Sequence, residues 1–185
     1  MKAVMITDKE YQTELFEQLR TRILMFLKNK GFEMEEIGIG REDLAFCMGC
    51  FGCWIKKPGE CVINDLMTKI NQEYIRSDVV IYLSPIIFGH FSANIKNAID
   101  RSLPNVLPFF RSKPDGSTGH PPRYDQYPKE IIVGYQEDLS EEDRQLFWDL
   151  TKNHRGKIEV LVCQNSEKIA EELSSIKLET AGGHS

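Results

Sequence analysis

The stretch 78-DVVIYLSPIIFG-89 decides how the rest of the chain is interpreted. Its centre, 79-VVIYL-83, is a continuous apolar run, which is typical of a strand buried on both faces of a parallel sheet. Pro85 and Gly89 mark a turn directly after it. A helix is predicted next, over residues 94–102. A buried strand, a turn and a helix in this order indicate a parallel α/β sheet.

Apolar periodicity predicts four more strands and four more helices around this unit. The strands cover 2–6, 32–39, 130–135 and 158–163, and the helices cover roughly 15–27, 65–75, 140–150 and 169–176. Strands that alternate with helices predict a three-layer sandwich, in which helices cover both faces of a five-stranded parallel sheet. We expect one domain over residues 1–178, followed by a flexible tail at 179–185.

Composition excludes several classes of protein. The chain has 185 residues, a net charge of −5 and 41% hydrophobic residues. An acidic balance gives no support to nucleic-acid binding, which usually needs a basic patch. The longest apolar runs are too short to cross a bilayer, and the N-terminus lacks a cleavable signal pattern. We therefore expect a cytoplasmic protein without a membrane or nucleic-acid partner, in which thiols mostly stay reduced.

Four of the five cysteines fall within 47-CMGCFGCWIKKPGEC-61, inside a loop that we call the cysteine loop, residues 40–63. The spacing C-x2-C-x2-C-x7-C supplies four thiolates, the usual ligand set of a [4Fe–4S] cluster, and Gly49 and Gly52 allow the loop to wrap. Four thiolates can also hold zinc, although zinc sites more often use two separated pairs. The same spacing is compatible with free thiols or with a redox-labile disulfide between Cys50 and Cys53. The candidate metal ligands are Cys47, Cys50, Cys53 and Cys61.

A second long loop, which we call the proline-rich loop, covers residues 104–128 and contains six prolines. Loops of this length are usually functional or disordered. It is either a lid or dimer-contact segment, or plain surface structure.

Two segments carry a resemblance to a known family. They are 47-CMGCFGCWIKKPGECVINDLM-67 and 77-SDVVIYLSPIIFGHFSANIKNAIDR-101. They resemble the flavodoxin-like NAD(P)H-dependent FMN reductases, and within them the iron–sulfur flavoprotein branch. The resemblance implies a flavodoxin-like sheet of order 2-1-3-4-5 and an FMN-dependent NAD(P)H oxidoreductase. Its electron acceptor would be a quinone, a protein or an iron–sulfur centre.

The resemblance also implies cofactor contacts and an assembly. By position, the loop after the third strand would contact the flavin ring through Pro85, Ile86, Ile87, Phe88, Gly89 and His90. The four cysteines would be the ligands of a [4Fe–4S] cluster. Relatives are often homodimers or homotetramers in which the cysteine loop and the long loop cover a neighbour's flavin. No residue is assigned to catalysis itself.

The segment 7-TDKEYQT-13 departs from the family pattern. Relatives have a loop here that is rich in Gly, Ser, Arg and Asn and binds the FMN phosphate at a helix N-terminus. Thr7 and Thr13, with Lys9, are the candidates for that role, but Asp8 and Glu10 place negative charge beside a dianion. Two further hypotheses follow: a binding or regulatory module that has lost FMN, and a flavin-free metal or thiol redox protein.

Overall fold

The fold is organised around one central sheet, seen in a computed structural model that describes residues 1–114, 116–155 and 158–178. In this part of the chain, five parallel strands run in the order β2-β1-β3-β7-β8. In chain order this is the predicted 2-1-3-4-5, so the predicted fold is confirmed. The strands are β1 (Lys2–Asp8), β2 (Glu33–Ile39), β3 (Val79–Ile87), β7 (Lys129–Tyr135) and β8 (Glu159–Cys163).

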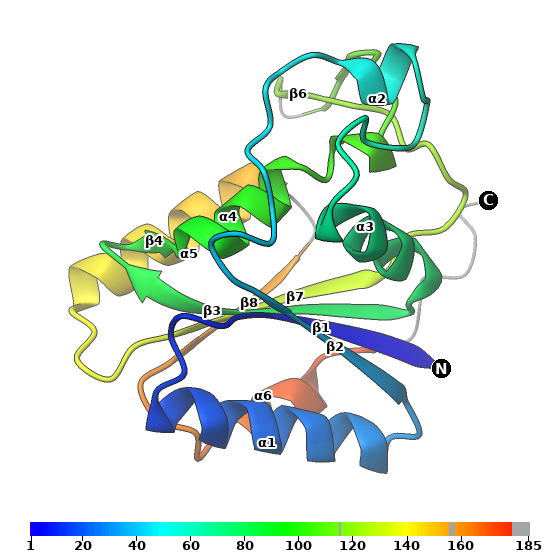
Figure 1. The fold of residues 1–185 in the computed structure, drawn as a ribbon. Helices are drawn as coiled ribbons and strands as arrows, with labels where there is room; N and C mark the ends of the chain where they lie inside the picture. Colours follow the sequence, from blue (N-terminus) through cyan, green and yellow to red (C-terminus); the bar gives the residue numbers. More distant parts are fainter. Residues whose placement is uncertain (115, 156–157, 179–185) are drawn as a thin grey trace.

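Helices cover both faces of this sheet (Figure 1). One face carries α1 (Glu14–Asn29) and α6 (Ile169–Ser175). The other carries α3 (Leu66–Arg76), α4 (Ala93–Asp100) and α5 (Glu141–Arg155). The predicted helices are all present within one to five residues of their expected ends, because buried apolar stripes decide where each one packs.

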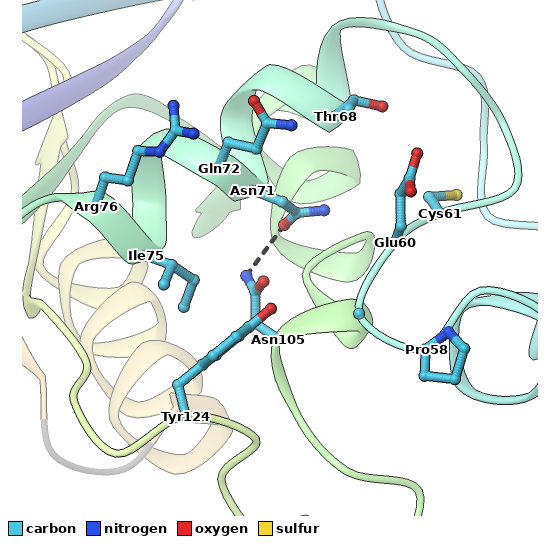
Figure 2. Close-up of a pocket in the computed structure, with 11 residues that line it drawn as sticks. Pro58, Glu60, Cys61, Thr68, Asn71, Gln72, Ile75, Arg76, Asn105 and Tyr124 are labelled. Carbon is cyan, nitrogen blue, oxygen red and sulfur yellow. Dashed lines mark hydrogen bonds between the residues drawn. The ribbon is translucent and has the colours of Figure 1, made fainter.

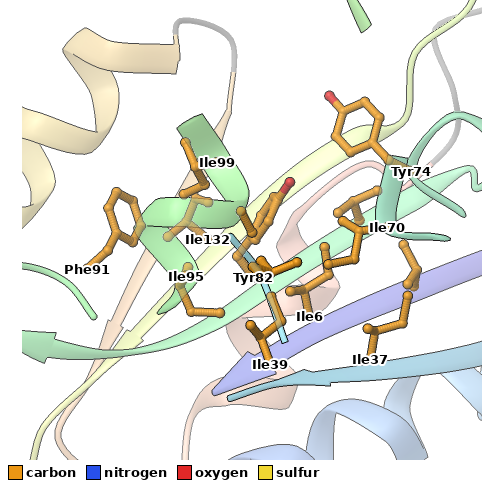
Figure 3. Packing of buried hydrophobic residues seen from close by; sticks show 14 of the residues in the cluster. Ile6, Ile37, Ile39, Ile70, Tyr74, Tyr82, Phe91, Ile95, Ile99 and Ile132 are labelled. Atoms are coloured by element: carbon orange, nitrogen blue, oxygen red, sulfur yellow. The ribbon is translucent and has the colours of Figure 1, made fainter. Parts of the chain in front are cut away.

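The side chains of β3 enter two separate cores. Tyr82 and Val80 pack with α3 and α4, whereas Ile81 and Leu83 pack with α1 and α6. Figure 3 shows Tyr82 among isoleucines of the first core, including Ile95 of α4. Alternation of side chains across a strand, with both faces covered, explains the continuous apolar run in the sequence.

The cysteine loop and the proline-rich loop form one layer above α3 and α4 (Figure 1). The first contains α2 (Gly52–Ile55), and the second contains η1 (Leu103–Asn105), β5 (Arg111–Ser112) and β6 (Thr118–Gly119). Trp54 joins them: its indole nitrogen donates to the carbonyls of Leu103 and Val106, each at 3.0 Å. Its ring also lies 5.0 Å from that of His120. These short elements were not predicted from the sequence.

Two further sequence predictions concern the C-terminal tail and membrane-spanning helices. The expected tail at 179–185 lies outside the described residues. Within the described residues, we find no helix with both the length and the apolar character that a membrane span requires.

Candidate functional site

A cavity of about 270 Å³ lies at the carboxyl ends of the central strands, and we call it the strand-end pocket. In a sheet of this order, β1 and β3 flank the point where the winding direction changes, and ligands bind outside that point. Three segments form the wall: the connection from β1 to α1, the end of β3 and the end of β7. The lining residues are Tyr11, Thr13, Leu15, Pro85, Ile86, Ile87, Tyr135, Gln136, Glu137 and Asp138.

The turn that follows β3 is a tight β-hairpin. Ile87 pairs with His90 and Ile86 with Phe91, so β4 (His90–Phe91) runs antiparallel to the end of β3. The two residues at the tip, Phe88 and Gly89, have φ of 49° and 68°. Positive φ at both positions is the geometry of a type I′ turn. The segment is therefore a hairpin, where the sequence predicted only a turn.

Packing against α5 fixes this hairpin. A Cβ at Gly89 would lie 2.6 Å from Cδ2 of Leu146, so only glycine fits both the backbone angle and the space. Phe88, by contrast, is 92% exposed. A phenylalanine with positive φ and almost no contacts is unusual enough to suggest a role outside folding.

The eight predicted flavin contacts do not all lie together. Thr13, Pro85, Ile86 and Ile87 line the strand-end pocket. The other four lie elsewhere: Thr7 is buried within β1, Phe88 stands at the hairpin tip, Gly89 packs on α5, and His90 accepts a hydrogen bond at Nδ1 from its neighbour's amide. Flavin contact by all eight stays a prediction.

Two further residues at the pocket were missed by sequence reasoning. Tyr135 donates from its hydroxyl to the carbonyl of Tyr11 across 2.7 Å. Burial raises the pKa of the Tyr135 phenol, and nearby Asp8 and Tyr11 raise it further, so this phenol stays neutral. The side-chain oxygen of Gln136 is buried and has no hydrogen-bond partner among the described residues. Gln136 lines the pocket, but this oxygen itself is not exposed to it. Their place at the end of a buried strand was the available signal.

The connection between β1 and α1 is shorter than expected, because β1 extends to Asp8 and was predicted to end at residue 6. Asp8 is fully buried: its Oδ1 accepts from the amide of Glu10 at 2.9 Å and from Asn94 at 3.0 Å. Its Oδ2 has no partner among the described residues. Thr13 caps α1, where its hydroxyl oxygen accepts from the amide of Phe16 at 3.2 Å.

The pocket fits a flavin ring better than it fits a phosphate. Pro85, Ile86 and Ile87 give it an apolar side. Its described lining includes two carboxylates, Glu137 and Asp138, and neither Lys nor Arg. A phosphate dianion needs amide donors or cations, as a helix N-terminus usually supplies them. The N-terminus of α1 reaches the pocket at Thr13, but its first turn carries Glu14 and Glu17, so the carboxylates around it disfavour the phosphate of FMN.

All four thiols of the cysteine loop are free: Cys47 and Cys50 are exposed, and Cys53 and Cys61 are half-buried. Burial raises the pKa of Cys53, and the charges of Cys61, Cys47 and Cys50 raise it further. Four thiols suit a cluster or zinc chemically. Within the described residues, however, no three His, Cys, Asp or Glu side chains are placed to hold a metal. Metal binding by these cysteines stays a prediction.

Arg101 connects the cysteine loop to α4. Its buried guanidinium forms an ion pair with Asp65 and donates to the carbonyl of Ala45 at 2.9 Å and to the sulfur of Cys61 at 3.3 Å. Burial would lower the pKa of Arg101, but hydrogen bonds to Asp65 and Cys61 raise it above its ordinary value. Sequence reasoning missed this residue, since a charged side chain after a helix is usually solvated.

Cys61 also faces a second cavity, of about 370 Å³, between the cysteine loop, α3 and the proline-rich loop (Figure 2). Inside it, the amide nitrogen of Asn105 donates to the side-chain oxygen of Asn71 at 3.0 Å. Tyr124 closes one side. This cavity shares no lining residue with the strand-end pocket. Cys61 therefore lies at a cavity that is separate from the strand-end pocket.

Comparison with known proteins identifies the family. Residues 9–117, more than half of the chain, match the family model of NADPH-dependent FMN reductases. The chain belongs to this family. It is 35% identical over 118 residues to an iron–sulfur flavoprotein of Archaeoglobus fulgidus, a match that covers 63% of this chain and 53% of the relative. An iron–sulfur flavoprotein of Methanosarcina thermophila is 29% identical over 103 residues, or 56% and 53% of the two chains.

These matches confirm the predicted family and its iron–sulfur flavoprotein-like branch. The chain spans about half the length of the curated relatives it matches. Among solved structures, it is similar to an NAD(P)H:quinone oxidoreductase of Methanothermobacter marburgensis, with a TM-score of 0.63, 11% identity and coverage of 94% and 90%. It is also similar to an azoreductase of Bacillus anthracis, with a TM-score of 0.63, 13% identity and coverage of 95% of this chain and 94% of the azoreductase. At such identities the likeness shows a shared fold.

Proposed function

We propose that this protein is a flavin-dependent NAD(P)H oxidoreductase whose flavin ring lies in the strand-end pocket. One observation carries the proposal: a member of the FMN reductase family has a cavity at the β1/β3 switch point, walled by Pro85, Ile86 and Ile87. These are residues that the resemblance assigned to ring contact. FMN is the cofactor that the family name implies, and NAD(P)H is the electron donor.

The residues of the pocket would bind and orient the ring. The apolar side formed by Ile86 and Ile87 excludes water from one ring face. Tyr135 stays neutral and is held by Tyr11, so it adds no charge. A bound flavin supplies electron exchange between the nicotinamide and an acceptor.

The acceptor is proposed to be a small quinone-type molecule. Two solved structures with the same fold are named NAD(P)H:quinone oxidoreductase and azoreductase. A planar conjugated acceptor can stack on the exposed face of a flavin ring, where Phe88 of the hairpin tip is free to contact it. A protein or iron–sulfur acceptor is the other possibility that the resemblance implies.

Flavin titration tests the proposal. Purified protein is titrated with FMN and riboflavin while flavin fluorescence is followed, and then NADPH or NADH oxidation is measured with a benzoquinone acceptor. Saturable quenching together with flavin-dependent turnover supports the proposal. Failure of both flavins to bind would contradict it and favour a flavin-free module or a metal or thiol redox protein.

The cysteine loop carries a second candidate function, the binding of a [4Fe–4S] cluster by Cys47, Cys50, Cys53 and Cys61. It is supported by the names of the matched relatives, which are iron–sulfur flavoproteins. Anaerobic purification followed by iron and sulfide analysis tests it. Iron and sulfide in equal amounts, lost in Cys50→Ser, would support a cluster. Zinc alone, or no metal, would rule it out.

Assembly as a homodimer or homotetramer is also proposed. The cysteine loop and the proline-rich loop both expose large apolar side chains, which are common at interfaces. Sedimentation analysis of the full chain tests the assembly, and a monomer at micromolar concentration would contradict it. The exposed apolar residues of the two loops are Phe46, Met48, Phe51, Ile55, Phe109 and Phe110.

The cytoplasmic location stays a prediction.

A further inference from the structure

We infer that the strand-end pocket selects a flavin without a phosphate group, of the riboflavin class, over FMN. The inference rests on the proposed function, because both require a flavin ring in this pocket. It goes further in naming the chemical form of the cofactor. Four features of the connection between β1 and α1 and of the pocket wall carry it.

The first feature is the use of backbone donors. A phosphate site needs amide N–H groups that point at the ligand. Here the amide of Lys9 donates to the carbonyl of Ile39 at 2.9 Å, which continues the pairing of β1 with β2. The amide of Glu10 donates to the carboxylate of Asp8, also at 2.9 Å. The amides of Lys9 and Glu10 are therefore used by the protein itself, and the amides left for a ligand are those at the N-terminus of α1, next to Glu14 and Glu17.

The second feature is the buried carboxylate of Asp8. It takes donors from Glu10 and from Asn94, which lies in the first turn of α4. The Asp8 carboxylate thus already accepts the hydrogen bonds that the amide of Glu10 and the side chain of Asn94 could donate to a ligand. A second, dianionic group nearby would be repelled by it, and more strongly than in water because Asp8 is fully buried.

The third feature is the direction of the one cation in this segment. The ammonium group of Lys9 lies 2.7 Å from the carboxylate of Asp43, which follows β2. Its side chain runs along Gly38, where a Cβ would lie 3.0 Å from Cγ of Lys9. Lys9 is therefore already paired, on the β2 side of the connection, and the charge it could offer a phosphate is offset.

The fourth feature is the charge of the remaining wall. Glu137 and Asp138 line the pocket, and Glu14 and Glu17 lie in the first turn of α1. Uncharged hydroxyl groups suffer no repulsion from these carboxylates. They can also donate to these carboxylates, which the phosphate dianion of FMN cannot do. The same wall that disfavours the phosphate of FMN thus accepts the terminal hydroxyl that riboflavin has in its place.

The test compares the two flavins on the full chain. Riboflavin and FMN are each titrated into wild type, Glu137→Lys and Glu33→Lys, and the dissociation constants are obtained from fluorescence quenching. Glu33 is the matched control. It is an exposed glutamate at the amino end of β2, whereas the pocket lies at the carboxyl ends of the strands. Both variants change the net charge equally.

We expect wild type to bind riboflavin about tenfold more tightly than FMN. Glu137→Lys should strengthen FMN binding by roughly three- to tenfold and leave riboflavin within about twofold, whereas Glu33→Lys should change neither. Equal or tighter binding of FMN by wild type would overturn the inference and leave the proposed function standing. An unchanged ratio in Glu137→Lys would also overturn it. Binding of neither flavin would overturn both.

Discussion

The guanidinium of Arg101 donates to the sulfur of Cys61 across 3.3 Å while it forms an ion pair with Asp65. One buried cation at the end of α4 thus holds the last thiol of the cysteine loop and the first residue before α3. It also binds the carbonyl of Ala45, just before the first thiol. The position of the whole cysteine loop depends on this side chain.

Replacement of Arg101 should therefore destabilise the protein. Arg101→Met leaves the carboxylate of Asp65 without its cation, and breaking a buried pair costs about 3 kcal/mol or more. The free energy of unfolding in urea measures this. The control is Arg20→Met, which breaks a more exposed pair with Glu36 and should cost about 1 kcal/mol or less. Equal losses in the two variants would refute the structural role of Arg101.

The same ion pair should make stability depend on acidity. Burial alone would raise the pKa of Asp65, but hydrogen bonds from Arg101 and from the amides of Ala45 and Met67 lower it below the ordinary value of 3.8. In this range the unfolded chain binds more protons, so the stabilisation is complete above the unfolded pKa and is lost as the pH falls below it. Unfolding measured between about pH 6 and 3 should show this loss, and Asp65→Asn should show a smaller slope. An identical dependence of stability on pH in wild type and Asp65→Asn would show that the ion pair of Asp65 with Arg101 is not the cause of the loss.

The hairpin tip should tolerate glycine better than phenylalanine. Phe88 has positive φ and is almost fully exposed, so Phe88→Gly should raise the free energy of unfolding by about 0.5–1 kcal/mol. Phe109→Gly is the control, since Phe109 is also exposed but lacks positive φ, and it should lower stability instead. If Phe88 contacts the acceptor, Phe88→Gly should also raise its KM. If Phe88→Gly lost as much stability as Phe109→Gly, the positive φ of Phe88 would not be a source of strain.

Blocking the strand-end pocket should abolish flavin binding. Ile87 lines the cavity, and a tryptophan there would fill much of its 270 Å³. Ile87→Trp should weaken riboflavin binding by at least about tenfold, as measured by fluorescence quenching. Met25→Trp, on the exposed side of α1, should leave it unchanged. Unchanged affinity in Ile87→Trp would place the flavin elsewhere.

The sheet and its helices were predictable because their signals are local. The apolar run at β3 and the four-residue spacing of Leu15, Leu19 and Ile23 depend only on which side chains are buried. The end of β1 was not predictable in the same way. Thr7 and Asp8 look like loop residues, and only the pairing with β2 shows that they continue the strand.

The candidate site was predicted in part for a similar reason. Pro85, Ile86 and Ile87 follow a strand whose end forms the pocket, so position along the chain was enough. Tyr135 and Arg101 gain their roles from segments distant in sequence: a hydrogen bond to Tyr11 at the pocket in one case, a buried ion pair in the other. The hairpin was missed because its tip holds Phe88, whereas Asn or Gly is the usual signal for a type I′ turn.

Flavin reduction by a nicotinamide tests the central claim most directly. Protein saturated with the flavin that binds best is mixed anaerobically with NADPH or NADH, and the absorbance of the oxidised flavin is followed. We expect a rapid loss of this absorbance in wild type and in Met25→Trp, but not in Ile87→Trp. Bleaching no faster than that of free flavin under the same conditions would contradict it.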